Sequence, residues 1–188
     1  RISLVLATPE GQDPNITMNT FELGRNFGNK IWNASRFVKM NLGEDFPREY
    51  IDGIQYPDEK LDLMDKWILS RLNATIRDVR KNLRNFKLST AAKNLYDFIW
   101  RDYCDWYVEL AKPRLYEEDN EEDGKVVRNV LAYVIDNMLR LLSPYMPFIT
   151  EEIWHLMRDL YMGSGETITL QKYPEVNQEL INSGLEKK

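Results

Sequence analysis

The residues with the most direct chemical potential are the chain's one histidine, His155, and its one cysteine, Cys104. Glu152 and His155 have the Glu-x-x-His spacing of helical di-iron sites, but those sites need a second such pair, which one histidine cannot supply. The same shortage excludes a usual structural zinc site, because that site takes several Cys and His ligands. A Cys–His nucleophile pair stays formally open, although the aromatic surroundings at residues 103–107 are typical of a structural thiol. Residues 163–165 lack the Lys-Ser/Thr of a phosphate loop, so the sequence predicts no catalytic centre and no metal site.

Amides and cations in residues 24–42 indicate a different chemistry. Asn26, Lys30 and Asn33 are spaced by four and three, so a helix would place them on one face. Amides and guanidinium groups read the exposed base edges of single-stranded RNA, while cations hold the phosphates. The charged residues of this segment are all basic, and they are Arg25, Lys30, Arg36 and Lys39. The alternative is that the asparagines cap or bridge neighbouring helices and that the cations are simply solvated.

A second basic segment, residues 66–93, has Asp78 as its only acidic residue. It offers mainly Arg and Lys, among them Arg80 and Arg84, which suit phosphates better than bases. The acidic residues gather in a predicted loop at residues 117–124, so the net charge of −5 hides both basic segments. Solvated helix faces are again the alternative.

Hydrophobic spacing by three and four predicts an all-α fold, an antiparallel bundle of four to five long helices with short links. The predicted helices cover residues 19–42, 59–86, 90–110, 125–142 and 147–161. Residues 167–173 alternate enough to predict a short extended segment, and residues 2–7 are ambiguous. Gly43 suits a left-handed cap, Ser89 suits an N-cap, and Pro113 should fall just past the end of the third helix.

Two predicted apolar faces define much of the expected core. The first helix contributes Leu23, Phe27, Ile31, Ala34, Phe37 and Val38. The third contributes Ala92, Leu95, Ile99, Tyr103, Trp106 and Leu110. The aromatic residues around Trp100 could stack on unpaired bases, but their helical spacing favours core packing.

The composition is that of one globular domain, with 188 residues, 43% hydrophobic and 29% charged. A single cysteine excludes an internal disulfide framework and makes a reducing, cytoplasmic compartment the expectation. No apolar run approaches the ~20 residues that span a bilayer, so no membrane partner is predicted. Arg1 rather than Met begins the chain, which we interpret as a cut inside a longer polypeptide.

Three blocks, in order along the chain, resemble a known family. Residues 24–37 read Gly-Arg-Asn-Phe-Gly-Asn-Lys-Ile-Trp-Asn-Ala-Ser-Arg-Phe. Residues 65–73 read Asp-Lys-Trp-Ile-Leu-Ser-Arg-Leu-Asn and are followed by an aromatic block at residues 96–114. Residues 142–154 read Leu-Ser-Pro-Tyr-Met-Pro-Phe-Ile-Thr-Glu-Glu-Ile-Trp. Together they resemble the anticodon-binding domain of valyl-tRNA synthetase over about residues 1–175. The later blocks would also suit isoleucyl and leucyl relatives, whereas the first block points to the valyl enzyme.

The resemblance implies the helical bundle that holds the anticodon stem-loop of tRNA(Val), within a class I synthetase that joins valine to tRNA using ATP and Mg²⁺. The family's His-Ile-Gly-His and Lys-Met-Ser-Lys-Ser motifs are absent from the sequence, so this chain alone should be inactive. Catalytic and editing domains should belong to the same polypeptide, a monomer in the cytoplasm. Residues 1–18 would lead in from the catalytic domain, residues 19–175 would form the bundle, and residues 176–188 would begin a linker.

Valine tRNAs share A and C as the second and third anticodon bases, and we expect the first basic helix to recognise them, because it combines amides with cations whereas the second offers mainly Arg and Lys. The residues expected to contact the tRNA are Arg25, Asn26, Asn29, Lys30, Asn33, Arg36, Lys39, Arg80 and Arg84. A helical protein-interaction scaffold, with solvated basic faces, is the alternative from another functional class.

Overall fold

The computed structural model describes residues 1–8, 11, 13, 16–43, 47, 53–117, 119–158 and 167–185. Within these residues it contains helices and turns and no strand, which confirms the predicted all-α bundle. The α-helices are α1 (Ile2–Ala7), α2 (Met18–Leu42), α4 (Leu63–Arg84), α5 (Leu88–Asp97), α6 (Val108–Leu115), α7 (Glu121–Leu142) and α8 (Pro147–Arg158). A π-helical segment, η2 (Phe98–Tyr107), joins α5 to α6 in one continuous rod, and short 3-10 turns form η1 (Asp58–Lys60), η3 (Ile168–Leu170) and η4 (Gln178–Leu180).

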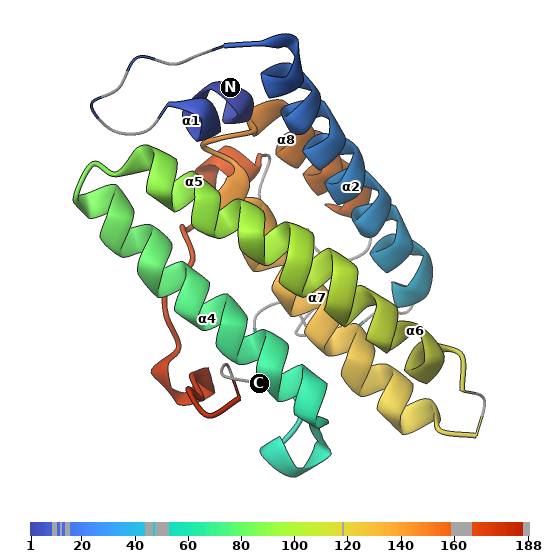
Figure 1. Cartoon of the computed structure of the whole chain (residues 1–188). Helices are drawn as coiled ribbons and strands as arrows, with labels where there is room; N and C mark the ends of the chain where they lie inside the picture. The colour runs from blue at the N-terminus through green and yellow to red at the C-terminus, as the bar shows by residue number, and fades with distance from the viewer. Residues whose placement is uncertain are drawn as a thin grey trace.

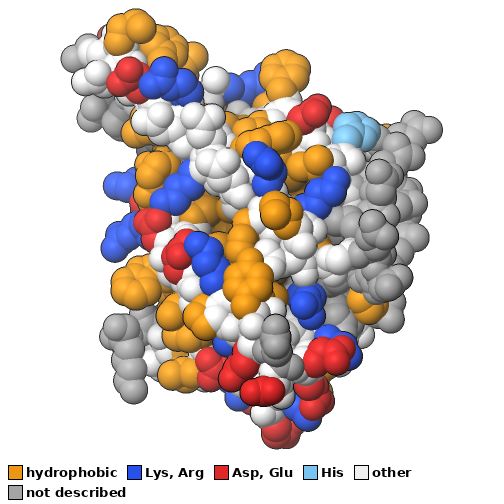
Figure 2. Space-filling model, turned by 90° about the vertical axis from the view of Figure 1, so that its right-hand side faces the viewer, with side chains coloured by type: hydrophobic (Ala, Val, Ile, Leu, Met, Phe, Trp, Pro, Cys, Tyr) orange, Lys and Arg blue, Asp and Glu red, His pale blue; other side chains and the backbone are white. Residues whose placement is uncertain are grey.

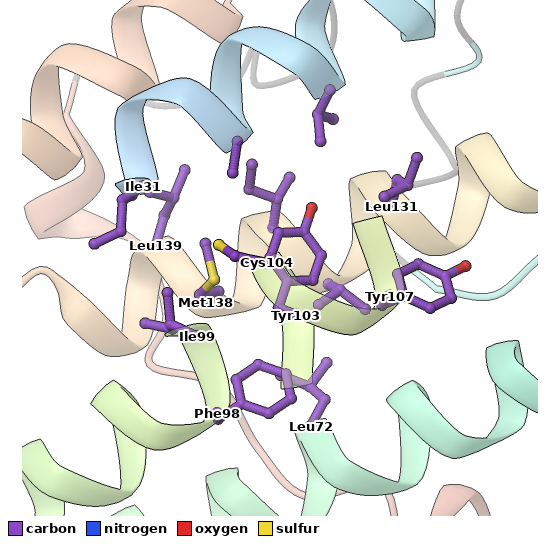
Figure 3. Close-up of a cluster of buried hydrophobic side chains, with 14 of the residues drawn as sticks. Ile31, Leu72, Phe98, Ile99, Tyr103, Cys104, Tyr107, Leu131, Met138 and Leu139 are labelled. Atoms are coloured by element: carbon purple, nitrogen blue, oxygen red, sulfur yellow. The ribbon is translucent and has the colours of Figure 1, made fainter. Parts of the chain in front are cut away.

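Figure 1 shows the α5–η2–α6 rod running antiparallel to both α4 and α7, with α2 on the opposite flank from α4. The most deeply buried helix is α7, which packs against α2, α4, α5, α6 and α8. Its apolar residues meet side chains of α2, α4 and the rod in one continuous core, drawn in part in Figure 3. Close packing of this kind fixes the orientation of every helix face, including the polar face of α2.

The π-helical segment changes which face of the rod is buried. Residues Ile99, Tyr103, Tyr107, Ala111 and Leu115 are buried at intervals of four, whereas the prediction placed Trp106 and Leu110 in the core. Trp106 and Leu110 are instead 60% and 41% exposed. Hydrogen bonds from i to i+5 place more residues in each turn than an α-helix has, so the apolar stripe shifts by one residue. The prediction for these side chains was therefore wrong because it assumed an α-helical period.

Several predicted helix ends also differ from the structure. The helix predicted from residue 59 begins at Leu63, and the one predicted from residue 90 begins at Leu88 without a side-chain cap from Ser89. That rod continues through Pro113 to Leu115, because burial of its last turn outweighs the cost of a proline inside the helix. Residues 121–123, predicted as acidic loop, form the first turn of α7, where carboxylates are favoured by the helix dipole. Gly43 follows the last residue of α2 with a positive φ of 78°, but its ψ of 173° lies outside the left-handed helical region, so the predicted left-handed cap is not formed.

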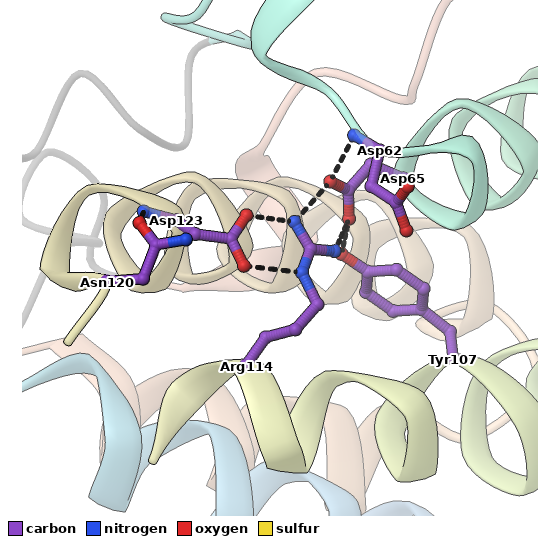
Figure 4. A network of polar contacts seen from close by, with 6 residues as sticks. All are labelled: Asp62, Asp65, Tyr107, Arg114, Asn120 and Asp123. Atoms are coloured by element: carbon purple, nitrogen blue, oxygen red, sulfur yellow. Dashed lines mark hydrogen bonds and ion pairs between the residues drawn. The ribbon is translucent and has the colours of Figure 1, made fainter. Parts of the chain in front are cut away.

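A partly buried arginine between two carboxylates joins α4, the rod and α7 (Figure 4). The Arg114 guanidinium donates to both oxygens of Asp65 at 2.9 Å and, through Nε, to Asp123 at 2.8 Å. Asp65 is fully buried and also accepts hydrogen bonds from the Tyr107 hydroxyl at 2.7 Å and from the backbone N–H of Asp62 at 3.0 Å. Burial lowers the pKa of Arg114, but the hydrogen bonds to Asp123 and Asp65 outweigh it and raise the pKa above its ordinary value. We call these four residues, Asp65, Tyr107, Arg114 and Asp123, the Arg114 junction.

The C-terminal part of the described chain lies along α4. Residues 167–173, predicted as extended, form the turn η3 and then continue without regular secondary structure. The backbone N–H of Asn177 donates to the Asn73 side chain at 2.9 Å, and that of Asn182 donates to the Ser70 hydroxyl at 2.8 Å. These contacts fix residues 174–182 on the outer side of α4.

Candidate functional site

The polar face of α2 is held outward by close packing on its other side. Gly24 faces α1, where a Cβ atom would lie 2.0 Å from the Ser3 Oγ atom, so α2 can approach Ser3 this closely only because residue 24 has no side chain. The same side of α2 buries Phe27, Ile31 and Val38. The predicted apolar face is confirmed apart from Leu23, which is 40% exposed near the start of the helix.

The candidate residues on this face divide into exposed and partly enclosed side chains. The exposed ones are Arg25, Asn26, Asn29, Asn33 and Arg36. Arg25 lies 3.6 Å from Glu22 in an exposed ion pair, and the helix does not enclose the three asparagines. Figure 2 shows the side of the molecule on which α2 lies, with Lys and Arg side chains spread among uncharged and hydrophobic ones, and many of the acidic side chains near its lower end.

Lys30 differs from its neighbours because it lies in the seam between α2 and η2. Its ammonium group pairs with Asp105 and lies 4.0 Å from the centre of the Trp100 ring. Only 24% of the side chain is exposed. The charge of Lys30 is therefore partly compensated within the chain, by a carboxylate and by a cation–π contact.

Aromatic rings line the same seam. Tyr96 and Trp100 stack with ring centres 5.6 Å apart, and Phe27 lies 4.7 Å from Tyr96. Further along α2, the Lys112 ammonium lies 5.6 Å from the centre of the partly buried Phe37 ring. Sequence reasoning missed Asp105, Trp100 and Lys112 as neighbours of the α2 face, because they lie on another helix far along the chain.

Several cations of the second basic segment form ion pairs or hydrogen bonds within the fold. Lys66 pairs with Asp58 and Arg71 pairs with Asp102, each at 2.8 Å. Arg80 donates to the backbone carbonyl of Pro174 at 2.8 Å. Burial raises the pKa of Asp102, and the neighbouring Arg71 offsets only part of that rise.

The end of α4 nevertheless forms a basic pocket against residues 174–176. The pocket has a volume of about 470 Å³ and is lined by Arg77, Arg80, Lys81, Arg84, Asn85, Glu175 and Val176. Of the predicted site residues, Arg80 and Arg84 thus lie together in this pocket. The other seven lie on α2, on the opposite flank of the bundle (Figure 1).

Cys104 and His155, the two residues with the most direct chemical potential, both lie in surroundings without a nucleophile pair or metal cluster among the described residues. Burial raises the pKa of Cys104 to about 12, so the thiol stays protonated and is a poor nucleophile. His155 is exposed and lies 3.2 Å from Glu151 on its own helix. No group of three or more metal-ligating side chains comes together among the described residues. None of the described helices is long and apolar enough to cross a membrane.

Comparison with known proteins gives one consistent answer. The family described as the anticodon-binding domain of tRNA ligase matches residues 65–188. The chain is 48% identical to the valine–tRNA ligase of Synechocystis sp. over 169 residues, which are 88% of this chain and 18% of that protein. It is 46% identical to the valine–tRNA ligase of Fusobacterium nucleatum over the whole chain and 20% of that protein. The chain thus spans about a fifth of the length of these relatives.

A solved structure supports the fold independently. The chain aligns with the LeuRS of Agrobacterium radiobacter K84, solved as a LeuRS-tRNA-LeuAMS complex, with a TM-score of 0.68 and 19% sequence identity. The alignment covers 97% of this chain and 20% of that chain. With the family match and the helical bundle together, this chain belongs to the family of anticodon-binding domains of tRNA ligases.

Proposed function

We propose that this chain is the anticodon-binding part of a valine–tRNA ligase and that the polar face of α2 contacts the anticodon loop of tRNA(Val). The observation that carries the proposal is the 43–48% identity to three valine–tRNA ligases over 88–100% of the chain. The face of α2 supports it, because exposed amides and cations on one rigid helix are the groups that read unpaired bases and hold phosphates.

The division of roles on α2 follows from exposure. Asn26, Asn29 and Asn33 offer donors and acceptors for base edges, while Arg25 and Arg36 reach bases or phosphates. Lys39 is partly enclosed near the end of the helix and suits a phosphate. Lys30 would have to leave Asp105, or share its protons with it, to contact a base.

The remaining parts of the proposal concern the longer protein. Residues 1–18 lead in from a catalytic domain, residues 19–175 form the bundle, and residues 176–188 begin a linker. The catalytic domain uses ATP and Mg²⁺, and the ligase acts as a monomer in the cytoplasm. We expect the present chain alone to show no valine-dependent pyrophosphate exchange, since it lacks both nucleotide-site motifs of the family.

The test compares tRNA(Val) with the same tRNA carrying a changed anticodon, using fluorescence anisotropy to measure binding to the chain. The wild-type chain should bind tRNA(Val) more tightly than the tRNA with the changed anticodon. Lys30→Ala and Arg36→Ala should each lower the affinity for tRNA(Val) and affect the changed tRNA much less, because a base contact is worth about 1–3 kcal/mol of discrimination.

Equal losses on both tRNAs for the two variants would reduce α2 to a phosphate-binding helix. Equal affinity of the wild-type chain for both tRNAs would contradict anticodon recognition itself. Kcat/KM for charging, measured with the ligase that contains this chain, gives the same comparison in the reaction.

A further inference from the structure

The basic pocket at the end of α4 has features that the anticodon proposal does not use. Arg77, Arg80, Lys81 and Arg84 line one pocket together with a single carboxylate, Glu175. Among the described residues, no hydrogen-bond or ion-pair partner meets the Lys81 or Arg84 side chain, and both side chains are exposed. Four cations and one carboxylate around one hollow leave it with a net positive charge.

Two of the four guanidinium or ammonium groups are already positioned by the fold. Arg80 is fixed by its hydrogen bond to the Pro174 carbonyl, and Arg77 is paired with Asp78 at 3.0 Å. The segment at residues 174–176 closes one side of the pocket and is itself held on α4 through Asn177 and Asn73. A prearranged set of arginine donors loses little side-chain entropy when it binds a phosphate.

Stabilisation of the helix end explains only part of this arrangement. Lys81 and Arg84 lie in the last turn of α4, where cations are favoured by the helix dipole. Arg77 and Arg80 lie before that turn, beyond the short range of the dipole, yet they line the same pocket.

An exposed aromatic residue that follows the pocket-lining residues in sequence favours a nucleic acid over a simple anion. Phe86 follows Asn85, which lines the pocket, and its ring is 86% exposed. Its backbone has a positive φ of 58°, which is unusual for a residue with a Cβ atom and is strained. Cations together with an exposed ring are the combination that binds an RNA strand, through phosphates and base stacking.

We propose that this pocket binds the sugar-phosphate backbone of RNA at a place outside the anticodon loop, without reading sequence. The proposal rests on the proposed function for the identity of the RNA. Its site is separate, because α2 and the α4 pocket lie on opposite flanks of the bundle (Figure 1). A single tRNA would therefore meet this pocket with nucleotides outside its anticodon loop.

The experiment measures binding of tRNA(Val) and of its anticodon-changed form to the chain as salt is raised from 50 to 200 mM. The test variant is Lys81→Ala/Arg84→Ala, and the matched control is Lys93→Ala/Arg101→Ala, which removes the same charge from exposed positions outside the pocket. Each phosphate contact contributes about 0.7–0.9 to the slope of log K against log salt. Wild type should therefore lose about ninefold more affinity over this range than the test variant, equally for both tRNAs.

An unchanged salt slope for Lys81→Ala/Arg84→Ala, with the anticodon preference intact, would overturn the pocket proposal and leave the proposed function standing. Equal affinity of the wild-type chain for tRNA(Val) and its anticodon-changed form would count against the proposed function instead. Displacement of the RNA by poly-glutamate as efficiently as by unlabelled RNA of equal charge would overturn the RNA assignment. If the double variant loses its helical circular dichroism, Arg84→Lys, which keeps the charge, should bind like wild type and Arg84→Glu should not.

Discussion

The Arg114 junction and the α2 face are built from similar side chains and have opposite surroundings. At the junction, a guanidinium is enclosed by Asp65 and Asp123, and every carboxylate oxygen of Asp65 accepts a hydrogen bond. On α2, Arg25 and Arg36 are exposed beside exposed amides. Burial and pairing therefore decide whether a charged side chain stabilises the fold or stays available to a partner. The two regions should respond to substitution in separable ways.

The largest effect is expected at the junction. Arg114→Met would leave the buried Asp65 carboxylate without its cation, and the free energy of unfolding should fall by about 3–5 kcal/mol. Urea denaturation followed by circular dichroism measures the loss. Lys112→Met is the matched control, because its partner Glu109 is exposed and such a pair contributes about 0–1 kcal/mol. A loss below 1 kcal/mol for Arg114→Met would show that the junction does not hold the helices together.

An intermediate effect is expected on α2, and it should appear in binding rather than in stability. Asn33→Ala removes an exposed amide, so the free energy of unfolding should change by no more than about 0.5 kcal/mol. If Asn33 reads a base, discrimination between tRNA(Val) and its anticodon-changed form should fall by about 1–3 kcal/mol in an anisotropy titration. Gln178→Ala, an exposed amide on the other flank, serves as control. If the Asn33→Ala variant discriminates between the two tRNAs as well as the wild type does, other side chains read the bases.

A smaller effect is expected at Lys30, which is partly enclosed and paired although it lies on the otherwise exposed polar face of α2. Asp105→Asn removes the carboxylate that holds the Lys30 ammonium group. The affinity for tRNA(Val) should rise by up to ~1 kcal/mol, and by more than the affinity for its anticodon-changed form, because the freed ammonium can contact a base and a negative charge leaves the seam between α2 and η2. The same anisotropy titration detects the change, and it should diminish as salt is raised. A fall in affinity for tRNA(Val) alone would instead indicate that Asp105 positions Lys30 for base contact.

The smallest effect concerns stability at the π-helical segment. Trp106→Ala should change the free energy of unfolding by about 0.5 kcal/mol or less, since the ring is 60% exposed. An α-helical register would bury this ring and make the same change cost about 3–5 kcal/mol. Chemical denaturation of the single variant distinguishes the two registers.

Hydrophobic periodicity was sufficient to predict the bundle and the outward face of α2. Phe27, Ile31 and Val38 recur at the helical period, so the asparagines between them had to face outward. The same periodicity failed from Tyr103 onward, because a π-helical segment has no sequence signal in the pattern of apolar residues. The predicted starts of the helices that begin at Leu63 and Glu121 were wrong. Tertiary contacts and the helix dipole set these starts, and the pattern of apolar residues does not report either of them.

The state of the individual cations could not be predicted from the sequence. Lys30 and Asp105 are 75 residues apart, and Arg80 and the Pro174 carbonyl are 94 residues apart. Local spacing contains no information about such pairs, so a count of bases in a segment overstates the number of free charges. The basic pocket itself emerges only when residues 174–176 lie against α4.

The position of residues 174–182 on α4 also determines when the basic pocket can form during protein synthesis. Their hydrogen bonds to Arg80, Asn73 and Ser70 join residues 94, 104 and 112 positions apart in sequence. A ribosome adds about 5–20 residues per second, so α4 is complete some 5–20 s before the segment that closes its pocket has been made. During that interval Arg80 has no Pro174 carbonyl to bond, and the outer side of α4 is uncovered. The basic pocket is thus among the last features of the domain to form during synthesis.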